Sequence, residues 1–203
     1  MLASIGVSIL LPIWFFYVLC VYVAVTLGYS FVFKRQQTID IVVLAGLYTT
    51  RLFAGGAAAG IFPSFWLLGF SMFVFLCLAI VKRISEILRK AEKGQEEDKI
   101  SGRGYFISDL NILTSLGSAS AMVSILVFAM YVNSPDVIQM YETPMILWSV
   151  CPLFGYWIVR MMIMASRMQI DEDPISFALK DRRSWVVGGI LVVALVLASV
   201  VKI

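Results

Sequence analysis

The chain has no histidine among its 203 residues and is poor in charge, because Asp, Glu, Lys and Arg together make up 14% of it. The absence of histidine excludes a histidine base, a zinc site built on histidine and a haem with an axial histidine. The three cysteines, Cys20, Cys77 and Cys151, all fall within apolar runs. They are expected to pack as small apolar side chains and not to form a disulfide framework.

Apolar residues, in contrast, make up 61% of the chain. A soluble domain carries about 45–50% apolar and about 25% charged residues. The excess is too large for a soluble core and is typical of a surface that faces lipid. The composition therefore predicts an all-α, polytopic membrane helix bundle, with residues 1–203 as a single transmembrane domain.

Six apolar runs are long enough to cross a bilayer, whose hydrocarbon core of about 30 Å requires about 20 residues of helix. The runs are 13–33, 39–61, 64–81, 110–132, 144–166 and 185–201. Pro12 separates residues 1–11 from the first run, since proline is disfavoured inside a helix. Residues 1–11 are interpreted as the tail of an earlier helix.

The basic residues predict the orientation of these helices. All but three of the 16 Lys and Arg residues lie in the loops after the first, third and fifth runs; the three are Arg51, Arg160 and Lys202. The positive-inside rule places those loops in the cytoplasm, so both termini are expected outside. Because topology explains the basic loops, they do not indicate a nucleic-acid partner.

Arg51 lies near the middle of the second run, where an arginine costs at least about 2.5–3.5 kcal/mol on insertion scales. Asp40, Leu44, Leu47 and Arg51 recur at helical spacing and share one stripe. The two charges are about 16 Å apart along a helix axis, too far to pair directly. The stripe is expected to line a polar cavity open to the cytoplasm; the alternative is an arginine paired with a neighbouring helix for packing.

Two further segments place cations at cytoplasmic helix ends. Segment 29–35 carries Tyr29, Lys34 and Arg35, which suit an anionic ligand but also ordinary contact with lipid headgroups. Segment 82–86 carries Lys82 and Arg83 with Glu86 one turn later, so local salt bridges are possible. This second group could hold a phosphate by charge, or it could be a solvated continuation of the helix.

The acidic segment 171–174 has two interpretations. Asp171 and Asp173 could bind a divalent cation through carboxylate oxygens. Asp173 could instead cap a short helix that has Pro174 at its first position, which is the favoured interpretation.

These segments, in this order, resemble the UbiA superfamily of intramembrane prenyltransferases over nearly the whole chain. The segments that carry the resemblance are 29–35 (YSFVFKR), 40–46 (DIVVLAG), Arg51 with 54–56 (AGG), 82–86 (KRISE), 102–105 (GRGY) and 173–182. The last two resemble the branch that contains polyprenyl-phosphate phosphoribosyltransferases and fusions to dehalogenase-like domains.

The resemblance implies nine helices around a cavity open to the cytoplasm, of which this chain has about six. It also implies a polyprenyl lipid substrate and Mg²⁺ held by two acidic motifs, where the metal offsets charge on a leaving diphosphate. The bacterial inner (plasma) membrane is the expected location. A missing N-terminal half is an expected partner.

Two departures from the family pattern affect the expected reaction. No Asn-Asp-x-x-Asp-x-x-x-Asp motif occurs in the chain, and basic residues with Glu86 replace the second acidic motif. This favours phosphoribosyl transfer to a polyprenyl phosphate over prenyl transfer to a polar or aromatic acceptor. The alternatives are a non-catalytic or degenerate membrane scaffold, one piece of a split enzyme and, less favoured, a transporter.

The residues expected to act follow from the resemblance and from charge. Those assigned to diphosphate or acceptor contacts are Tyr29, Lys34, Arg35 and Asp40. Arg51 is expected to line the cavity. Those assigned to phosphate binding at the second-motif position are Lys82, Arg83 and Glu86. Asp171 and Asp173 are the residues assigned to a metal under the less favoured of their two interpretations.

Overall fold

The computed structural model describes residues 12–92, 104–170 and 173–201, which form helices joined by short turns. The α-helices are α2 Ile13–Phe31, α3 Ile39–Ala59, α4 Phe65–Glu92, α5 Leu110–Val132, α6 Pro135–Met140, α7 Val150–Ser166, α8 Pro174–Lys180 and α9 Arg182–Val200. The 3₁₀ turns are η1 Phe33–Arg35, η2 Ile107–Asp109 and η3 Pro144–Ser149.

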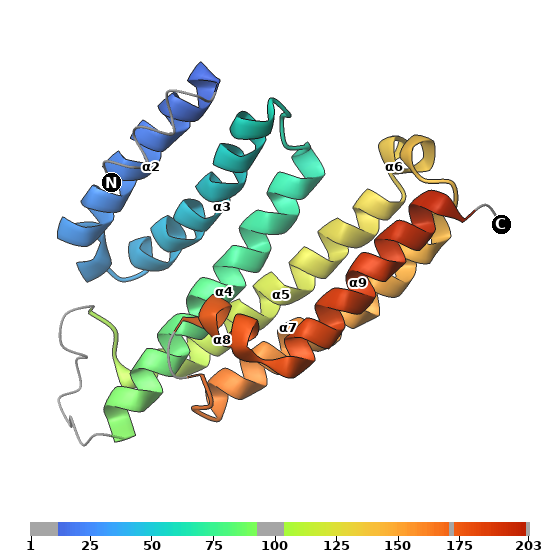
Figure 1. Cartoon of the computed structure of the whole chain (residues 1–203). Helices are drawn as coiled ribbons and strands as arrows, with labels where there is room; N and C mark the ends of the chain where they lie inside the picture. Colours follow the sequence, from blue (N-terminus) through green and yellow to red (C-terminus); the bar gives the residue numbers. More distant parts are fainter. Residues whose placement is uncertain (1–11, 93–103, 171–172, 202–203) are drawn as a thin grey trace.

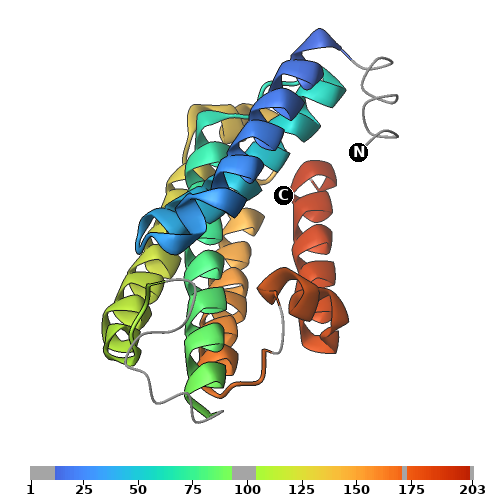
Figure 2. The same ribbon diagram turned by 90° about the vertical axis from the view of Figure 1, so that its left-hand side faces the viewer.

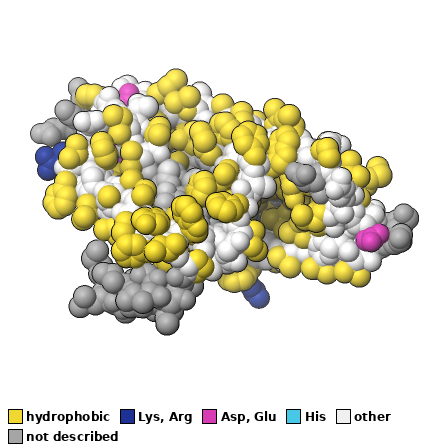
Figure 3. Space-filling view, turned by 90° about the horizontal axis from the view of Figure 1, so that it is seen from above, with side chains coloured by type: hydrophobic (Ala, Val, Ile, Leu, Met, Phe, Trp, Pro, Cys, Tyr) yellow, Lys and Arg dark blue, Asp and Glu magenta, His cyan; other side chains and the backbone are white. Residues whose placement is uncertain are grey.

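The predicted fold class is confirmed, because six of the helices are long and apolar enough to cross a membrane. One of the six spans, Pro144–Ser166, combines η3 with α7. None of the α2 side chains is buried inside the chain. Apolar side chains cover most of the face in Figure 3, with few charged ones at its margins. The protein is an integral, multi-pass membrane protein.

Several helix ends differ from the predicted ones for local reasons. α4 continues to Glu92 instead of ending at residue 81, because its extension buries Arg83, Ile84 and Ile87 against the protein. α3 ends at Ala59, since Gly60 adopts a left-handed conformation with φ of 69°. α9 begins three residues early, at Arg182, where the Asp181 carboxylate accepts the Ser184 N–H.

α4 lies at the centre of the bundle and contacts α3, α5, α7 and α8. α2, α3 and α4 follow one another side by side, whereas α9 packs on α7 and η3 (Figure 1). Figure 2 shows α9 at a distance from α2 and α3, with α8 at its foot. The core surrounds α4 and includes Cys77, Ile80, Ile84, Ile158 and Met161.

Contacts between loops support the alternation predicted from the basic residues. The Tyr105 hydroxyl accepts the Thr38 N–H at 3.1 Å, which joins the first loop to the third. Arg89, at the end of α4, donates to the Ile170 carbonyl at 2.7 Å, which brings in the fifth loop. At the opposite end, the Thr143 N–H donates to the last turn of α9. The basic loops therefore share one end of the bundle, while their cytoplasmic location stays a prediction.

Candidate functional site

Arg83 lies at the basic end of the bundle and is almost fully buried, with 1% of its side chain exposed. Asp40, at the start of α3, is fully buried beside it. Arg83 Nη2 donates to Asp40 Oδ1 at 3.1 Å, and Nε forms an ion pair with Oδ2. Because the guanidinium is a planar fork, this two-sided contact fixes its orientation.

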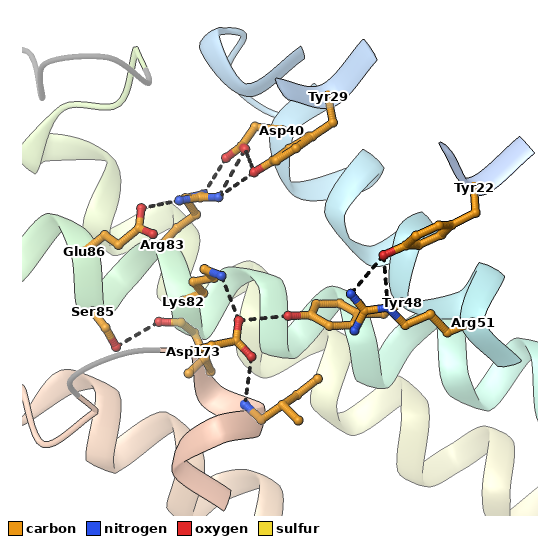
Figure 4. A network of polar contacts seen from close by, with 12 residues as sticks. Tyr22, Tyr29, Asp40, Tyr48, Arg51, Lys82, Arg83, Ser85, Glu86 and Asp173 are labelled. Carbon is orange, nitrogen blue, oxygen red and sulfur yellow. Dashed lines mark hydrogen bonds and ion pairs between the residues drawn. The ribbon is translucent and has the colours of Figure 1, made fainter. Parts of the chain in front are cut away.

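Two more side chains complete this group, which we call the Arg83 cluster: Tyr29, Asp40, Arg83 and Glu86 (Figure 4). The Tyr29 hydroxyl, from α2, donates to Asp40 Oδ1 at 2.7 Å and accepts from Arg83 Nη2 at 3.1 Å. Glu86 pairs with Arg83 Nη1, as its i,i+3 spacing predicts. The cluster joins three helices, and its second carboxylate leaves it with a formal excess of one negative charge.

A second polar contact lies between α3, α4 and the start of α8, and we call it the α8 tether: Tyr48, Lys82 and Asp173. Lys82 Nζ is 2.7 Å from Asp173 Oδ1, and the Tyr48 hydroxyl donates to the same oxygen at 2.8 Å. The other oxygen of Asp173 accepts the Ile175 N–H at 3.3 Å, so the predicted cap is confirmed. Lys82 thus pairs with Asp173, and not with Glu86 one turn away.

Arg51 contacts tyrosines instead of a carboxylate. Its Nη2 donates to the Tyr22 hydroxyl at 3.0 Å, and its guanidinium carbon lies 5.1 Å from the Tyr48 ring centroid. Arg51 and Asp40 do not pair, as predicted, and Tyr48 connects Arg51 to the α8 tether (Figure 4). The Arg51 side chain is exposed within the part of the chain that the structure describes.

The remaining predicted residues lie outside both groups. Lys34 is half-buried and Arg35 is exposed in η1, and neither side chain makes a hydrogen bond or ion pair with another described residue. Asp171 lies outside the described residues. The structure therefore brings six of the predicted residues into two neighbouring polar groups, with Arg51 adjoining the second.

Arg160 carries the same sequence signal as Arg51, a cation within an apolar run, but was assigned no role from the sequence. Arg160 lies within an apolar run and forms a two-pronged ion pair with Asp181, at 2.7 and 3.0 Å. Burial alone would raise the pKa of Asp181, but hydrogen bonds from Arg160 and Ser184 outweigh it and hold that pKa below its ordinary value. This pair attaches the start of α9 to α7.

The described residues do not fit a Mg²⁺ site by themselves. Among residues 12–92, 104–170 and 173–201, no three Asp, Glu or Cys side chains gather as a metal site would require. Asp40 and Glu86 face Arg83, and Asp173 faces Lys82. Mg²⁺ therefore stays a prediction from the resemblance to the UbiA superfamily.

An apolar groove of about 730 Å³ adjoins the α8 tether, between α4, α7, α8 and α9. Its lining includes Phe75, Phe154, Trp157, Ile175 and Trp185. The volume falls in the range of about 300–1,000 Å³ that is usual for small-molecule sites.

Acidification is expected to release α8 only at low pH. Burial alone would raise the pKa of Asp173, but hydrogen bonds from Lys82 and Tyr48 outweigh it and lower that pKa. A depressed carboxylate pKa stabilises the fold fully above its unfolded value, about 3.9, and this contribution is lost as pH falls through the folded value. Trp185 fluorescence, which senses α8 through the Leu179 carbonyl, should stay constant from pH 7 to 5 and change below about 4.

The matched control for this titration is Asp173→Asn, which removes the ion pair with Lys82 at every pH. It should show the altered fluorescence already at pH 7. A transition of the natural protein between pH 5 and 6 would contradict the prediction.

No protein-family model matches the chain. The uncharacterized protein y4nM of Sinorhizobium fredii is 38% identical over 201 residues, which cover 98% of this chain and 38% of that protein. The nodulation protein NoeC of Azorhizobium caulinodans is 30% identical over 165 residues, covering 81% of this chain and 53% of NoeC. The decaprenyl-phosphate phosphoribosyltransferase of Mycolicibacterium smegmatis is 39% identical over 106 residues, covering 52% of this chain and 33% of the enzyme.

The chain thus spans about half, or less, of the length of these relatives. Over part of its length it is distantly homologous to NoeC and to decaprenyl-phosphate phosphoribosyltransferases of the UbiA superfamily.

Proposed function

We propose that the chain is part of a UbiA-like intramembrane transferase that moves a phosphoribosyl group from its diphosphate to a polyprenyl phosphate. The observation that carries the proposal is the pair of polar groups at the basic end of the bundle, beside an apolar groove. Homology to decaprenyl-phosphate phosphoribosyltransferases supports the choice of substrates. Such a site can bind a lipid phosphate from the membrane and a sugar diphosphate from the water at the membrane–water interface.

In this reaction the lipid phosphate oxygen attacks the anomeric carbon of the sugar, and inorganic diphosphate leaves. Lys82 has the charge and the partial exposure needed to bind a phosphate, since its side chain is 24% exposed. Arg83 has a different role, because its guanidinium already binds Asp40, Glu86 and Tyr29. We assign Arg83 to positioning α4 and Lys82 against α2 and α3.

The test is a transferase assay in isolated membranes with added magnesium. One reaction supplies labelled phosphoribosyl diphosphate with decaprenyl phosphate, and the other supplies labelled prenyl diphosphate with 4-hydroxybenzoate. Each is run with the chain alone and with its upstream coding region. Labelled phosphoribosyl lipid is the expected product.

The other outcomes separate the alternatives. Product formed only with the upstream region would identify one piece of a split or longer enzyme. Product from the prenyl reaction alone would replace the phosphoribosyl assignment by prenyl transfer. No product from any combination would overturn the proposal in favour of a non-catalytic membrane scaffold.

A further inference from the structure

α8 covers one end of the apolar groove. Pro174, Ile175, Ala178 and Leu179 of this short helix all line the groove, and α8 contacts both α4 and α9. Figure 2 shows α8 at the foot of α9, beside the lower part of α4. An apolar chain that enters this end of the groove therefore packs against α8, and the position of α8 sets how much room the chain has.

The two ends of α8 are held by contacts of different kinds. At the start of α8, Lys82 and Asp173 of the α8 tether form a monodentate ion pair, and their side chains are 24% and 25% exposed. Just after the end of α8, Asp181 forms a bidentate ion pair with Arg160. The Arg160 side chain is 11% exposed and the Asp181 side chain is 15% exposed. A monodentate ion pair with partners about one quarter exposed is weak and can exchange, whereas a less exposed bidentate pair is stronger. The start of α8 is therefore the end that can move.

The charged residues of the α8 tether adjoin one end of the apolar groove. Leu78 lines the groove one helical turn before Lys82, and Phe75 stacks on the Tyr48 ring with centroids 5.4 Å apart. The other lining side chains along α9 are apolar or small. This pattern suits an amphiphile that has a long hydrocarbon chain and an anionic headgroup.

We propose that Asp173 occupies on Lys82 the place of a lipid phosphate, and that a long-chain lipid phosphomonoester displaces it and enters the groove. This inference rests on the proposed function for the ligand class and adds the exchange that admits the ligand. The phosphate accepts hydrogen bonds from the Lys82 ammonium and the Tyr48 hydroxyl, which now both donate to Asp173. The start of α8, freed from α4, moves aside for the chain while Arg160 keeps its end in place.

The test measures binding of radiolabelled decaprenyl phosphate to the purified protein in phosphatidylcholine nanodiscs, without any turnover. Asp173→Asn removes the competing charge, so it should tighten binding about two- to fivefold, the range of a partly exposed ion pair. Lys82→Gln should weaken binding about tenfold or more, because it removes a charge-assisted contact to phosphate. Arg167→Gln is the matched control and should change nothing, because Arg167 is an exposed cation between α7 and α8.

Two further probes separate lipid from phosphate. Decaprenol has the chain without the charge, so it should bind weakly and respond to neither variant. Inorganic phosphate should not compete at millimolar concentrations, because the groove contributes to binding. In a variant whose other tryptophans are phenylalanine, decaprenyl phosphate should shift Trp185 emission in the natural protein and less in Asp173→Asn.

The outcomes distinguish the exchange from the proposed function. Normal binding of decaprenyl phosphate with no effect, or a weakening, in Asp173→Asn would overturn the exchange and leave the transferase proposal intact. Equal binding of decaprenol and decaprenyl phosphate would overturn the role of Lys82 as a phosphate ligand. Absence of any lipid binding, with active transferase in membranes, would overturn the groove as the site.

Discussion

Replacing Arg83 by glutamine is expected to destabilise the protein by about 3–5 kcal/mol, the cost of leaving a buried charge without its partner. Arg83 is 1% exposed and Asp40 is fully buried, so water cannot take the place of the guanidinium beside the carboxylate. Glu86 would lose its ion pair with Arg83 at the same time. The measurement is thermal unfolding of the purified protein in detergent, followed by intrinsic fluorescence.

Two further variants make this expectation specific. Arg183→Gln removes an exposed arginine at the basic end and should leave the unfolding temperature nearly unchanged. Adding Asp40→Asn to Arg83→Gln removes the carboxylate charge that had faced the guanidinium and should restore part of the lost stability. If the single Arg83 variant unfolded like the natural protein, the Arg83 cluster would not hold α2, α3 and α4 together.

Alanine at Lys82 is expected to reduce transferase turnover by about 10²–10³-fold, the usual effect of removing one preorganised group that stabilises developing charge. Lys82 belongs to the α8 tether and lies one helical turn after Leu78, which lines the groove, so the proposed lipid phosphate would bind there. Turnover would be measured in the membrane assay with labelled phosphoribosyl diphosphate, in the intact protein or an intact relative. Lys82→Arg, which keeps the charge, should retain more activity than alanine.

Lys34→Ala provides the comparison within the same assay. The family resemblance assigns Lys34 to diphosphate contacts, so its loss should also lower turnover sharply. The controls are the amount of protein in the membrane and its unfolding temperature, which exclude a folding defect. Normal turnover in both alanine variants would refute the assignment of these lysines to substrate binding.

The membrane-spanning architecture could be predicted because each helix is specified by its own residues. An apolar run of about 20 residues has few alternatives in a bilayer, since every backbone polar group must be satisfied within the helix. The end of α4 could not be predicted in this way. The charges in its extension are typical of a solvated helix, yet Arg83 is buried because it pairs with Asp40 of α3. A partner that is distant in the chain leaves no local sequence pattern.

The candidate site shows the same division. Spacing predicted the Arg83–Glu86 pair and the cap at Asp173. Spacing could not predict that Lys82 pairs with Asp173 and not with Glu86, because this pairing depends on where α8 packs. Tyr48 was missed since a tyrosine in an apolar run gives no signal until its hydroxyl finds a carboxylate. The backbone N–H of Thr38, whose φ is 67°, likewise donates to the hydroxyl of Tyr105, which lies 67 residues further along the chain.

The distance in sequence between Asp40 and Arg83 also bears on how the chain enters the membrane. Arg83 is made 43 residues after Asp40, which at about 5–20 residues per second is a delay of roughly 2 to 9 seconds. During that interval the start of α3 carries a carboxylate without the guanidinium that neutralises it, and burial of such a charge in lipid is costly. α2 and α3 are therefore expected to stay beside the translocation machinery until α4 emerges. The three helices are then expected to enter the bilayer together, already paired through Asp40 and Arg83.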